Sequence, residues 1–375
     1  MAFLRSSKSN DVVKDLHTGS RNIIINGGMQ VWERGTSNTN LGGTEAAAGY
    51  YTADRWTTRG LANAENWNGT QHQVACDGGA LLAGHTYAFK ITTTEPEASL
   101  AADEELDVAQ IIEAHNLLHL AYGTAAAKPM TLSFWVKSSV TGNFAFSIYQ
   151  ADGTRDIGFV YTITAQNTYE KKIINIPGDV SGSIDNNTGQ GLYLRWYLCA
   201  GSNFTSSATG GAWASSTDAR SAYGHAGNAT CTTDNATWEI TGVQLEVGTK
   251  ATAFDFQDFA DERRRCRRYY EKGGSTAIPY AIQYLVNGSD NKKAFLNAFF
   301  EVRKRAVPTV KDSYNGVEGN GYFDNWGVGN TGIIGSFQAS WMSVEKTSFY
   351  QTTSVTEDQP WNLTFMDWEA TAELT

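Results

Sequence analysis

Apolar and polar residues alternate along several short stretches of this chain, and this alternation constrains its fold more than any other feature. In Met130–Lys137, for example, Leu132, Phe134 and Val136 take one side of an extended backbone, and the residues between them take the other. Leu192–Cys199 repeats the pattern. Successive side chains of a β-strand point to opposite faces, so these stretches predict strands with one buried face.

The composition is typical of an all-β protein. Charged residues are 18% of the 375 residues, against roughly a quarter in an average soluble protein. There are 37 glycines, and aromatic residues reach 12%, as expected for aromatic-rich strands joined by tight turns. The net charge of −10 disfavours nucleic-acid binding. The single basic run, Arg263–Arg268, lies among acidic residues that can pair with it along a helix.

One predicted strand contains a break in its alternation. In Trp238–Val247 the apolar positions are even at first and odd from Val243 onward. A shift by one residue would turn the second half of a regular strand inside out. A β-bulge at Thr241-Gly242 restores the pattern, because glycine is the residue that a bulge tolerates best.

Other segments are predicted from spacing and composition. Residues 99–121 are the main helical candidate outside the arginine-rich segment, where Phe254–Lys272 has helical spacing. Met130–Lys137 and Asn143–Gln150 are expected to form a β-hairpin through a short polar link. Residues 200–236, rich in Gly, Ser, Ala, Thr and Asn, are expected to form a long loop.

We therefore expect an all-β protein with four parts. Residues 1–22 are polar and predict an N-terminal docking arm. Residues 23–256 predict a jelly-roll β-sandwich, and residues 257–273 predict a short connecting helix. Residues 274–375 predict a second, smaller β-sandwich-like domain.

No motif for catalysis or metal binding is evident. His115 and His119 are four residues apart, as two metal ligands on a helix would be, but Asn116 stands where the zincin motif needs its glutamate. Asp152–Asp156 and Asp185–Gly191 could offer oxygens to Ca²⁺, yet these residue types also serve ordinary turns. Among 39 acidic residues, a carboxylate pair at glycosidase spacing gives no specific signal. We expect no enzymatic activity, no cofactor and no metal.

The four cysteines, Cys76, Cys199, Cys231 and Cys266, form no Cys-x-x-Cys pair. The sequence leaves disulfides open, while scattered free thiols fit assembly in a reducing cytoplasm. The N-terminus lacks an apolar segment of signal-peptide length. No apolar run approaches the length of a membrane span, so we expect no membrane insertion.

Several stretches carry a recognisable combination of motifs. Asn22–Thr36 passes from an apolar run through Asn-Gly to Trp-Glu-Arg-Gly, and Tyr50–Trp56 ends in Ala-Asp-Arg-Trp. The arginine-rich segment contains Arg-Cys-Arg-Arg-Tyr-Tyr-Glu, and the chain ends in Trp-x-Ala-x-Ala-Glu-Leu. Together with the strands Pro129–Ser139 and Trp238–Gly248, this combination resembles a family of bacteriophage virion proteins, usually described as tail fibre or structural proteins.

This resemblance implies a carbohydrate-binding-like jelly roll in a virion fibre or spike, commonly a homotrimer. It implies binding to a host-surface receptor, with a glycan as the expected receptor. It also implies attachment to other phage tail or capsid proteins, for which we assign residues 1–22, and a location on the virion after assembly in the host cytoplasm. Three alternatives stay open: a capsid-decorating fibre protein, a polysaccharide depolymerase, and a binding module of a larger hydrolase.

Two sets of residues are candidates for these roles. Aromatic residues in polar, glycine-rich contexts can stack on a sugar ring, although each could instead plug a sandwich end or pack against a sister subunit. The candidate glycan contacts are Trp67, Trp213, Tyr223, Tyr322 and Trp326. The candidate assembly residues on the predicted helix are Phe259, Arg263, Cys266, Arg267 and Tyr270.

Overall fold

The computed structural model describes most of the chain. The residues that it describes are 20–39, 41–42, 49–59, 67–274, 283–285, 292–314, 317–318, 320–324, 333–336, 338–340, 342–353, 362–365 and 367–374. Of the docking arm predicted at residues 1–22, residues 1–19 lie outside the described residues.

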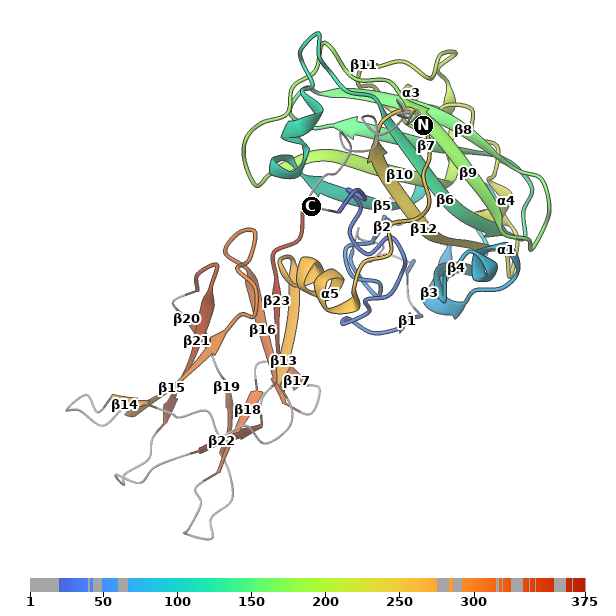
Figure 1. The fold of residues 1–375 in the computed structure, drawn as a ribbon. Coiled ribbons are helices and arrows are strands. Elements are labelled where there is room, and N and C mark those ends of the chain that lie inside the picture. The colour runs from blue at the N-terminus through green and yellow to red at the C-terminus, as the bar shows by residue number, and fades with distance from the viewer. Residues whose placement is uncertain are drawn as a thin grey trace, which may run out of the picture.

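Two antiparallel six-stranded sheets face each other in a jelly-roll β-sandwich (Figure 1). Sheet A has the strand order β1-β3-β4-β12-β6-β9, and sheet B has the order β11-β8-β7-β10-β5-β2. The strands of sheet A are β1 (Ser37–Asn38), β3 (Asn68–Ala75), β4 (Tyr87–Glu95), β12 (Thr237–Val247), β6 (Met130–Ser138) and β9 (Glu170–Ile176). Those of sheet B are β11 (Ala214–Ser215), β8 (Arg155–Ile163), β7 (Gly142–Gln150), β10 (Gln190–Ala200), β5 (Glu105–Glu113) and β2 (Thr57–Arg59).

The alternating apolar residues fill the space between the sheets. Trp196 of β10 lies at its centre, with ring centroids 4.8 Å from Phe146, 5.5 Å from Trp56 and 5.9 Å from Phe134. All four rings are fully buried. Offset and edge-to-face ring pairs of this kind stabilise a core beyond the area that they bury. The predicted inward faces of Met130–Lys137 and Leu192–Cys199 are confirmed.

The β-bulge predicted in Trp238–Val247 is confirmed. The pairing of β12 with β6 shifts register between Thr241 and Gln244, and Gly242 has a φ of +59°. The apolar residues on both sides of the bulge are buried in the same core: Trp238, Ile240, Val243 and Leu245.

The helix predicted at residues 99–121 is wrong. This segment contains the strand β5 and then the 3₁₀-helix η1 (Ala114–Leu120). All nine residues of β5 are buried. On its outer face, Ala109 and Ile111 are covered by Ile25, Val31, Cys266, Tyr269 and Leu374. A strand that is buried on both faces has no clean alternation and cannot be told from a buried helix by periodicity.

The predicted hairpin is also wrong. β6 pairs with β9 and β12 in sheet A, whereas β7 pairs with β8 and β10 in sheet B. Residues 139–141, which join β6 to β7, therefore cross from one sheet to the other. The two strands face the same core from opposite sheets. Both therefore alternate apolar and polar residues, although they do not pair with each other.

The predicted long loop, residues 200–236, contains short elements of its own. They are α2 (Ser202–Thr205), β11, α3 (Asp218–Ser221) and α4 (Ala229–Thr232). A disulfide between Cys199 and Cys231, 32 residues apart, ties α4 to the end of β10. The sequence alone did not predict whether this disulfide forms. Cys76 and Cys266 are free and buried.

After the sandwich the chain forms the helix α5 (Phe259–Arg267) and then further antiparallel strands (Figure 1). The helix is shorter than predicted, because Tyr270–Gly274 forms β13 and pairs with β23. The strands are β13, β14 (Gln283–Leu285), β15 (Lys292–Phe299), β16 (Thr309–Tyr314), β17 (Val317–Glu318), β18 (Asn320–Asp324), β19 (Ile333–Ser336), β20 (Gln338–Ser340), β21 (Lys346–Thr353), β22 (Asn362–Phe365) and β23 (Asp367–Thr371).

These strands form three sheets, in the orders β13-β23-β16-β17, β14-β15-β21-β20 and β19-β18-β22. Among the residues that the structure describes, the remaining α-helix is the short α1 (Gly78–Leu82). None of the helices in this described part is long and apolar enough to span a membrane.

The bulge gives the first prediction. A Cβ at Gly242 would lie 2.4 Å from His85 Nε2, in a left-handed backbone conformation. We expect Gly242→Ala to lower the free energy of unfolding by about 2–4 kcal/mol. Gly211 has a φ of +73° and no atom within 4 Å of such a Cβ, so Gly211→Ala should cost only about 1 kcal/mol. Denaturant titrations measure both losses, and equal losses would contradict the steric role of His85.

Candidate functional site

A carboxylate near the end of the chain is held by two arginines. Glu373 Oε1 accepts a hydrogen bond from Arg34 Nη2 at 3.0 Å, and Glu373 Oε2 is paired with Arg55 Nη1. The side chains of Glu373 and Arg55 are only 2% and 1% exposed. Next to this pair, Tyr50 Oη donates a hydrogen bond to the Leu374 carbonyl at 2.7 Å. Because an unpaired buried charge costs several kcal/mol, each member of the group needs the others.

Two tyrosine rings complete the group. The Arg34 guanidinium lies 3.6 Å from the ring centroid of Tyr270, and that of Arg55 lies 3.5 Å from the ring centroid of Tyr269. Tyr269 Oη in turn donates to Glu113 of β5 at 2.9 Å. Stacking on an aromatic face suits arginine, because its guanidinium is planar and weakly hydrated. We name Arg34, Arg55, Tyr269, Tyr270 and Glu373 together the Glu373 clamp.

The Glu373 clamp joins four of the six stretches that carry the family resemblance. Asn22–Thr36 supplies one arginine, and Tyr50–Trp56 supplies the other. The segment Arg-Cys-Arg-Arg-Tyr-Tyr-Glu supplies both tyrosines, and the terminal Ala-Glu-Leu supplies the carboxylate. All five side chains are buried or nearly so. These motifs therefore hold four distant parts of the chain together and leave their clamp side chains little access to an outside ligand.

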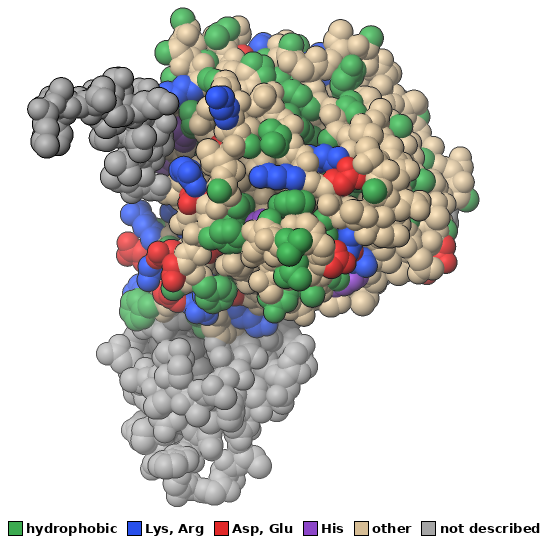
Figure 2. Space-filling view, turned by 45° about the vertical axis from the view of Figure 1, so that its right-hand side comes forward, with side chains coloured by type: hydrophobic (Ala, Val, Ile, Leu, Met, Phe, Trp, Pro, Cys, Tyr) green, Lys and Arg blue, Asp and Glu red, His purple; other side chains and the backbone are tan. Residues whose placement is uncertain are grey.

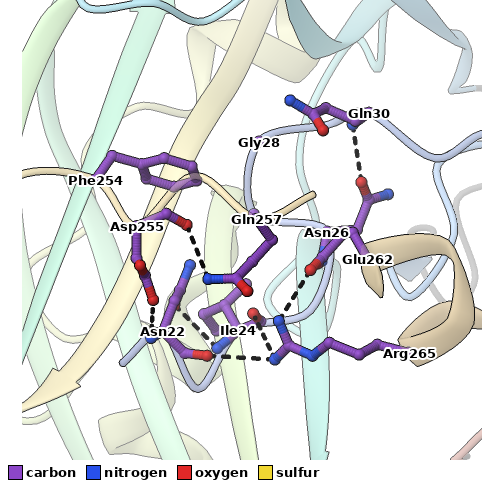
Figure 3. A pocket seen from close by; sticks show the side chains of 11 residues that line it. Asn22, Ile24, Asn26, Gly28, Gln30, Phe254, Asp255, Gln257, Glu262 and Arg265 are labelled. Atoms are coloured by element: carbon purple, nitrogen blue, oxygen red, sulfur yellow. Dashed lines mark hydrogen bonds and ion pairs between the residues drawn. The ribbon is translucent and has the colours of Figure 1, made fainter. Parts of the chain in front are cut away.

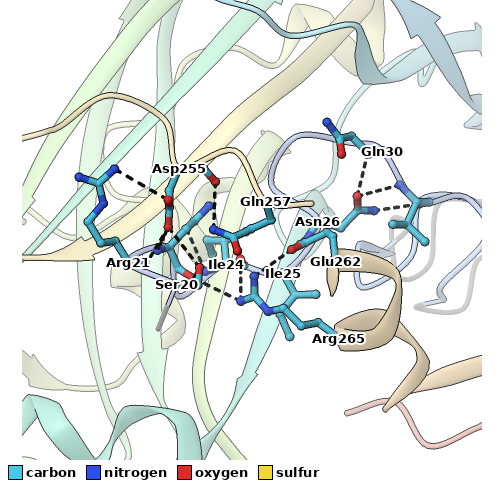
Figure 4. A network of polar contacts seen from close by, with 12 residues as sticks. Ser20, Arg21, Ile24, Ile25, Asn26, Gln30, Asp255, Gln257, Glu262 and Arg265 are labelled. Carbon is cyan, nitrogen blue, oxygen red and sulfur yellow. Dashed lines mark hydrogen bonds and ion pairs between the residues drawn. The ribbon is translucent and has the colours of Figure 1, made fainter. Parts of the chain in front are cut away.

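The helix α5 is fastened beside the clamp by polar contacts (Figure 4). Asp258 caps its N-terminus, where the Asp258 side chain accepts a hydrogen bond from the Ala260 amide. Arg265 donates from Nη2 to the carbonyl oxygens of Asn22 and Ile24 at 3.2 and 3.3 Å, and Glu262 accepts a hydrogen bond from the Asn26 amide. The helix therefore packs on the first residues of the sandwich.

The predicted assembly residues are mostly engaged within this chain. Arg263 and Arg267 both contact Glu33 Oε1, at 2.5 and 3.1 Å, while Cys266 and Tyr270 are each 1% exposed. Phe259 differs, because 55% of it is exposed. Only Phe259 thus offers most of its surface to a partner.

An open depression lies beside this network (Figure 3). Gly28, Gln30, Phe254, Gln257 and Arg265 are among the residues that line it. Many polar groups of the lining residues already form hydrogen bonds within the chain. The carbonyl oxygens of Asn22 and Ile24, for example, accept hydrogen bonds from Arg265. This depression is therefore an accessible surface feature rather than a built polar site.

A second polar group lies on the outer face of sheet B. Strand register places Asp107 of β5 opposite Arg59 of β2 and Tyr197 of β10. Arg195 reaches Asp107 Oδ2 from Nε at 3.1 Å and from Nη2 at 2.5 Å, and it reaches Glu105 Oε1 at 2.6 Å. Glu105 and Asp107 are two residues apart, so they project from the same face of β5.

Aromatic rings surround the Arg195 guanidinium. It lies 4.7 Å from the ring centroid of Tyr197 and 5.5 Å from that of Tyr193. Arg59 closes the edge of the group with long contacts, 3.8 Å to Glu105 and 3.4 Å to Tyr193 Oη. The Arg59 side chain is 38% exposed, which makes it the most accessible member of the charged set. We name Arg59, Glu105, Asp107, Tyr193, Arg195 and Tyr197 the outer-face cluster.

The outer-face cluster contains acceptors without donors. Asp107 Oδ1 and Glu105 Oε2 are buried and have no hydrogen-bond partner. Burial raises the pKa of Glu105, with Arg195 acting in the opposite direction. Burial also raises the pKa of Tyr193 to about 12. A buried acceptor that lacks a donor costs stability, so these oxygens are places where the hydroxyl of a ligand or of water would be favourable.

The structure separates the predicted glycan contacts. Trp67 is 1% exposed, and its Nε1 donates to Thr93 within the core, so it has no free ring face. Trp213 is half-buried, with its Nε1 bonded to the Pro177 carbonyl at 2.7 Å. Tyr223 is also half-buried and lies against the outer face of β8, close to Gly158. Tyr322 lies in β18, and Trp326 is outside the described residues.

The other candidate ligand sites are not assembled. His115 and His119 lie on the 3₁₀-helix η1, where a spacing of four residues does not align side chains. Asp152 Oδ2 accepts a hydrogen bond from the Asp185 amide at 2.9 Å, which joins the two turns considered for Ca²⁺. In the part of the chain that the structure describes, no three His, Cys, Asp or Glu side chains gather as a metal site.

Sequence reasoning missed the outer-face cluster. Its only visible signal was the polar face of Leu192–Cys199, where Arg195 stands between two tyrosines. The partners of Arg195 come from a segment that had been predicted as a helix, so strand register could not be applied to them.

Neither a protein-family model nor a curated protein matches this chain. Among solved structures, it is similar to the enzymatically active domain of tailspike protein 4 of bacteriophage CBA120, with 10% identity and a TM-score of 0.33. That match covers 61% of this chain and only 22% of the tailspike chain.

Carbohydrate-binding modules are also similar. A family 4 module (CBM4) is 12% identical with a TM-score of 0.29, and the match covers 60% of this chain and 98% of the module. The family 11 module from Clostridium thermocellum is 12% identical with a TM-score of 0.27, over 58% of this chain and 99% of the module. Superpositions of this quality say nothing about the ligand or activity of this chain.

The clamp region gives a pH prediction. Asp54, next to Arg55, is 1% exposed, and burial raises its pKa to about 7. An unfolded aspartate titrates near pH 4, so the folded chain binds more protons between about pH 4 and pH 7, and its stability falls as the pH rises through this window.

Asp54→Asn should remove this dependence, because an amide does not titrate and still accepts the Glu33 amide hydrogen bond that Asp54 Oδ2 accepts at 2.6 Å. Between pH 4.5 and pH 8 the wild type should lose about 2–4 kcal/mol relative to the variant. Denaturant titrations at both pH values measure this difference. The same pH dependence in both proteins would contradict the assignment.

Proposed function

We propose that this chain is a bacteriophage virion structural protein, a tail fibre or spike that binds a host-surface glycan as an oligomer. The combination of motifs that resembles phage virion proteins supports the virion role. The observation that carries the binding role is the outer-face cluster, in which aromatic rings and buried, unpartnered acceptors lie together on the outside of a sandwich sheet.

Glycans present hydroxyl donors and apolar ring faces, and the cluster offers a counterpart to both. In the proposed complex, Arg59 leaves its long contacts, and sugar hydroxyls donate to Glu105 Oε2 and Asp107 Oδ1. Arg195 holds both carboxylates in place through its ion pairs with them. Tyr193 supplies a ring face at the edge from which Arg59 withdraws. The proposed activity is adhesion, without turnover of the glycan.

Several weak contacts repeated on each subunit would gain avidity, and a trimer is the oligomer that we propose. Residues 1–22 would attach the chain to other phage tail or capsid proteins. In the proposed organisation, residues 23–256 are the binding sandwich, 257–273 connect it, and 274–375 form a distal β domain. The Cys199–Cys231 disulfide suits a virion surface, where the surroundings are oxidising. Cross-linking of residues 1–22 within particles distinguishes tail attachment from capsid attachment.

The test measures binding of the full chain to an array of neutral and acidic oligosaccharides. We expect Asp107→Asn to weaken binding at least tenfold, because it removes a charged acceptor. Arg59→Ala provides a second variant at an exposed position, in case Asp107→Asn does not fold. Because Arg59 leaves its contacts in the proposed complex, this variant should keep or strengthen binding, and a loss of binding would contradict the complex. The matched control is Glu239→Gln, which alters a carboxylate of sheet A that is also buried in a cluster, with Lys90, Lys137 and Tyr169.

Binding that Glu239→Gln abolishes and Asp107→Asn leaves intact would overturn the assignment to sheet B. Absence of binding to every glycan would contradict the receptor role. Release of new reducing ends from a polysaccharide by the wild type, and not by Asp107→Asn or Glu105→Gln, would replace adhesion with depolymerase activity.

A further inference from the structure

The charges of the outer-face cluster balance only while Arg59 is in place. The cluster holds two carboxylates, those of Glu105 and Asp107, and two guanidinium groups, those of Arg59 and Arg195. Arg59 stands directly opposite Asp107 where β2 pairs with β5. When Arg59 withdraws, as in the complex proposed above, one negative charge of the cluster loses its counter-charge. An uncompensated charge at a buried site is strongly unfavourable, so a ligand that displaces Arg59 has to replace its charge.

Arg59 balances these charges without supplying the missing hydrogen bonds. Its Nη2 lies 3.8 Å from Glu105 Oε1, and its Nη1 lies 3.4 Å from Tyr193 Oη. An N–H···O hydrogen bond usually spans about 2.7–3.2 Å, so both contacts are long. Glu105 Oε2 and Asp107 Oδ1 are buried and receive no hydrogen bond. A cation that approaches these oxygens closely would replace the charge of Arg59 and would also satisfy the two acceptors.

A primary ammonium group meets both requirements. It is a compact point charge with three N–H donors, whereas a guanidinium group is larger and planar. It is also attracted to aromatic ring faces, and the Arg59 guanidinium lies 5.7 Å from the ring centroid of Tyr193. A neutral sugar would bring hydroxyl donors without a charge, and an acidic sugar would add a negative charge. The cluster therefore favours a cationic sugar over both.

We propose that the glycan bound by this chain carries a free amine, and that its ammonium group takes the place of the Arg59 guanidinium beside Glu105 and Asp107. The ligand class is an amino sugar that is not N-acetylated. This inference rests on the proposed glycan-binding function and names the chemistry of its ligand. The ammonium donates to Glu105 Oε2 and Asp107 Oδ1, and the sugar ring lies against Tyr193. A lysine of a protein partner carries the same ammonium, but it has no ring face to place there.

General attraction between a cation and an acidic protein is a separate effect. The net charge of the chain is −10. On the face of the sandwich that Figure 2 shows, charged side chains are scattered among neutral ones, and both signs are present. General attraction should therefore respond to the net charge, wherever on the chain it is changed. A preference for an amine that depends on Arg59 and Asp107 would instead come from the outer-face cluster.

A proton is the alternative source of positive charge. Burial raises the pKa of Glu105, so this carboxylate could take up a proton when Arg59 leaves. The cluster would then need no cationic ligand. In that case the amine-bearing and the N-acetylated form of one sugar would bind equally well, which gives a direct comparison.

The test is titration calorimetry of the full chain at pH 6 with hexamers of glucosamine and of galactosamine, each compared with its N-acetylated form. The free amines are protonated at this pH, whereas an acetylated nitrogen carries no charge. We expect an amine-bearing hexamer to bind about tenfold or more tightly than its acetylated form, because only the amine replaces the charge of Arg59.

Two variants, each with a control of equal charge, locate this preference. Arg59→Ala should strengthen binding of the amine-bearing hexamer severalfold, because it removes the cation that the ligand has to displace. Its control is Arg264→Ala, which removes an arginine that is 60% exposed on α5 and should give no such gain. Asp107→Asn should abolish the preference for the amine. Its control is Asp261→Asn, at a carboxylate that is 65% exposed, which should keep the preference.

The Arg59 variant keeps the inference testable if Asp107→Asn does not fold, because the Arg59 side chain is 38% exposed at the edge of the sheet. Equal binding of the amine-bearing and acetylated forms, or an equal gain from Arg264→Ala, would overturn the inference. Equally tight binding of a lysine hexamer would overturn the sugar in favour of a protein partner. If another glycan binds and neither amine-bearing hexamer does, the inference fails and the proposed function stands. If no glycan binds, both fail.

Discussion

Two guanidinium groups, that of Arg55 fully buried and that of Arg34 nearly so, depend on the carboxylate of Glu373. Arg34 and Arg55 come from the first sixty residues, and Glu373 comes from the end of the chain, so their pairing closes the structure over its whole length. The cost of burying these charges is recovered only when all three are in place with their stacked rings. Folding of the sandwich edge, of α5 and of the C-terminal strand is therefore coupled through the Glu373 clamp.

The residues that hold the fold together are therefore separate from those proposed to bind a ligand. Four of the stretches that carry the family resemblance supply the clamp residues, so these side chains hold the chain together. The proposed glycan-binding surface lies elsewhere, at the outer-face cluster on sheet B. The Arg195 network of the outer-face cluster and the carboxylate of the Glu373 clamp are both buried ionic groups. They differ in that the first leaves carboxylate oxygens of Glu105 and Asp107 without donors, whereas the second leaves the Nε atoms of Arg34 and Arg55 without acceptors.

Much of the fold could be predicted because local physics dictates it. The alternation of Met130–Lys137 determines which side chains enter the core, and Gly242 determines where β12 changes register. The predictions that were wrong concern segments whose structure depends on contacts with residues distant in sequence. β5 has no clean alternation, since residues from the start of the chain, from α5 and from the chain end cover its second face. β6 and β7 both alternate in the same way, although they belong to opposite sheets.

The candidate site was less predictable than the fold. Trp67 has the sequence context of an open loop residue, but it lies in the core beside Thr93. Asp107 acquires its role only when β5 is placed beside β10, which a single sequence does not reveal. The arginines of α5 suggested contact with another molecule, yet Arg263 and Arg267 form ion pairs with Glu33 of the same chain.

The free energy of unfolding of Glu373→Gln tests the account most directly. Loss of this carboxylate leaves Arg34 and Arg55 buried without a counter-charge, so we expect the free energy to fall by about 3–5 kcal/mol. Asp261→Asn is the matched control, because Asp261 lies on α5 with its side chain 65% exposed in a surface pair with Arg264. It should change stability by no more than about 0.5 kcal/mol. A loss for Glu373→Gln no larger than that of the control would contradict the account.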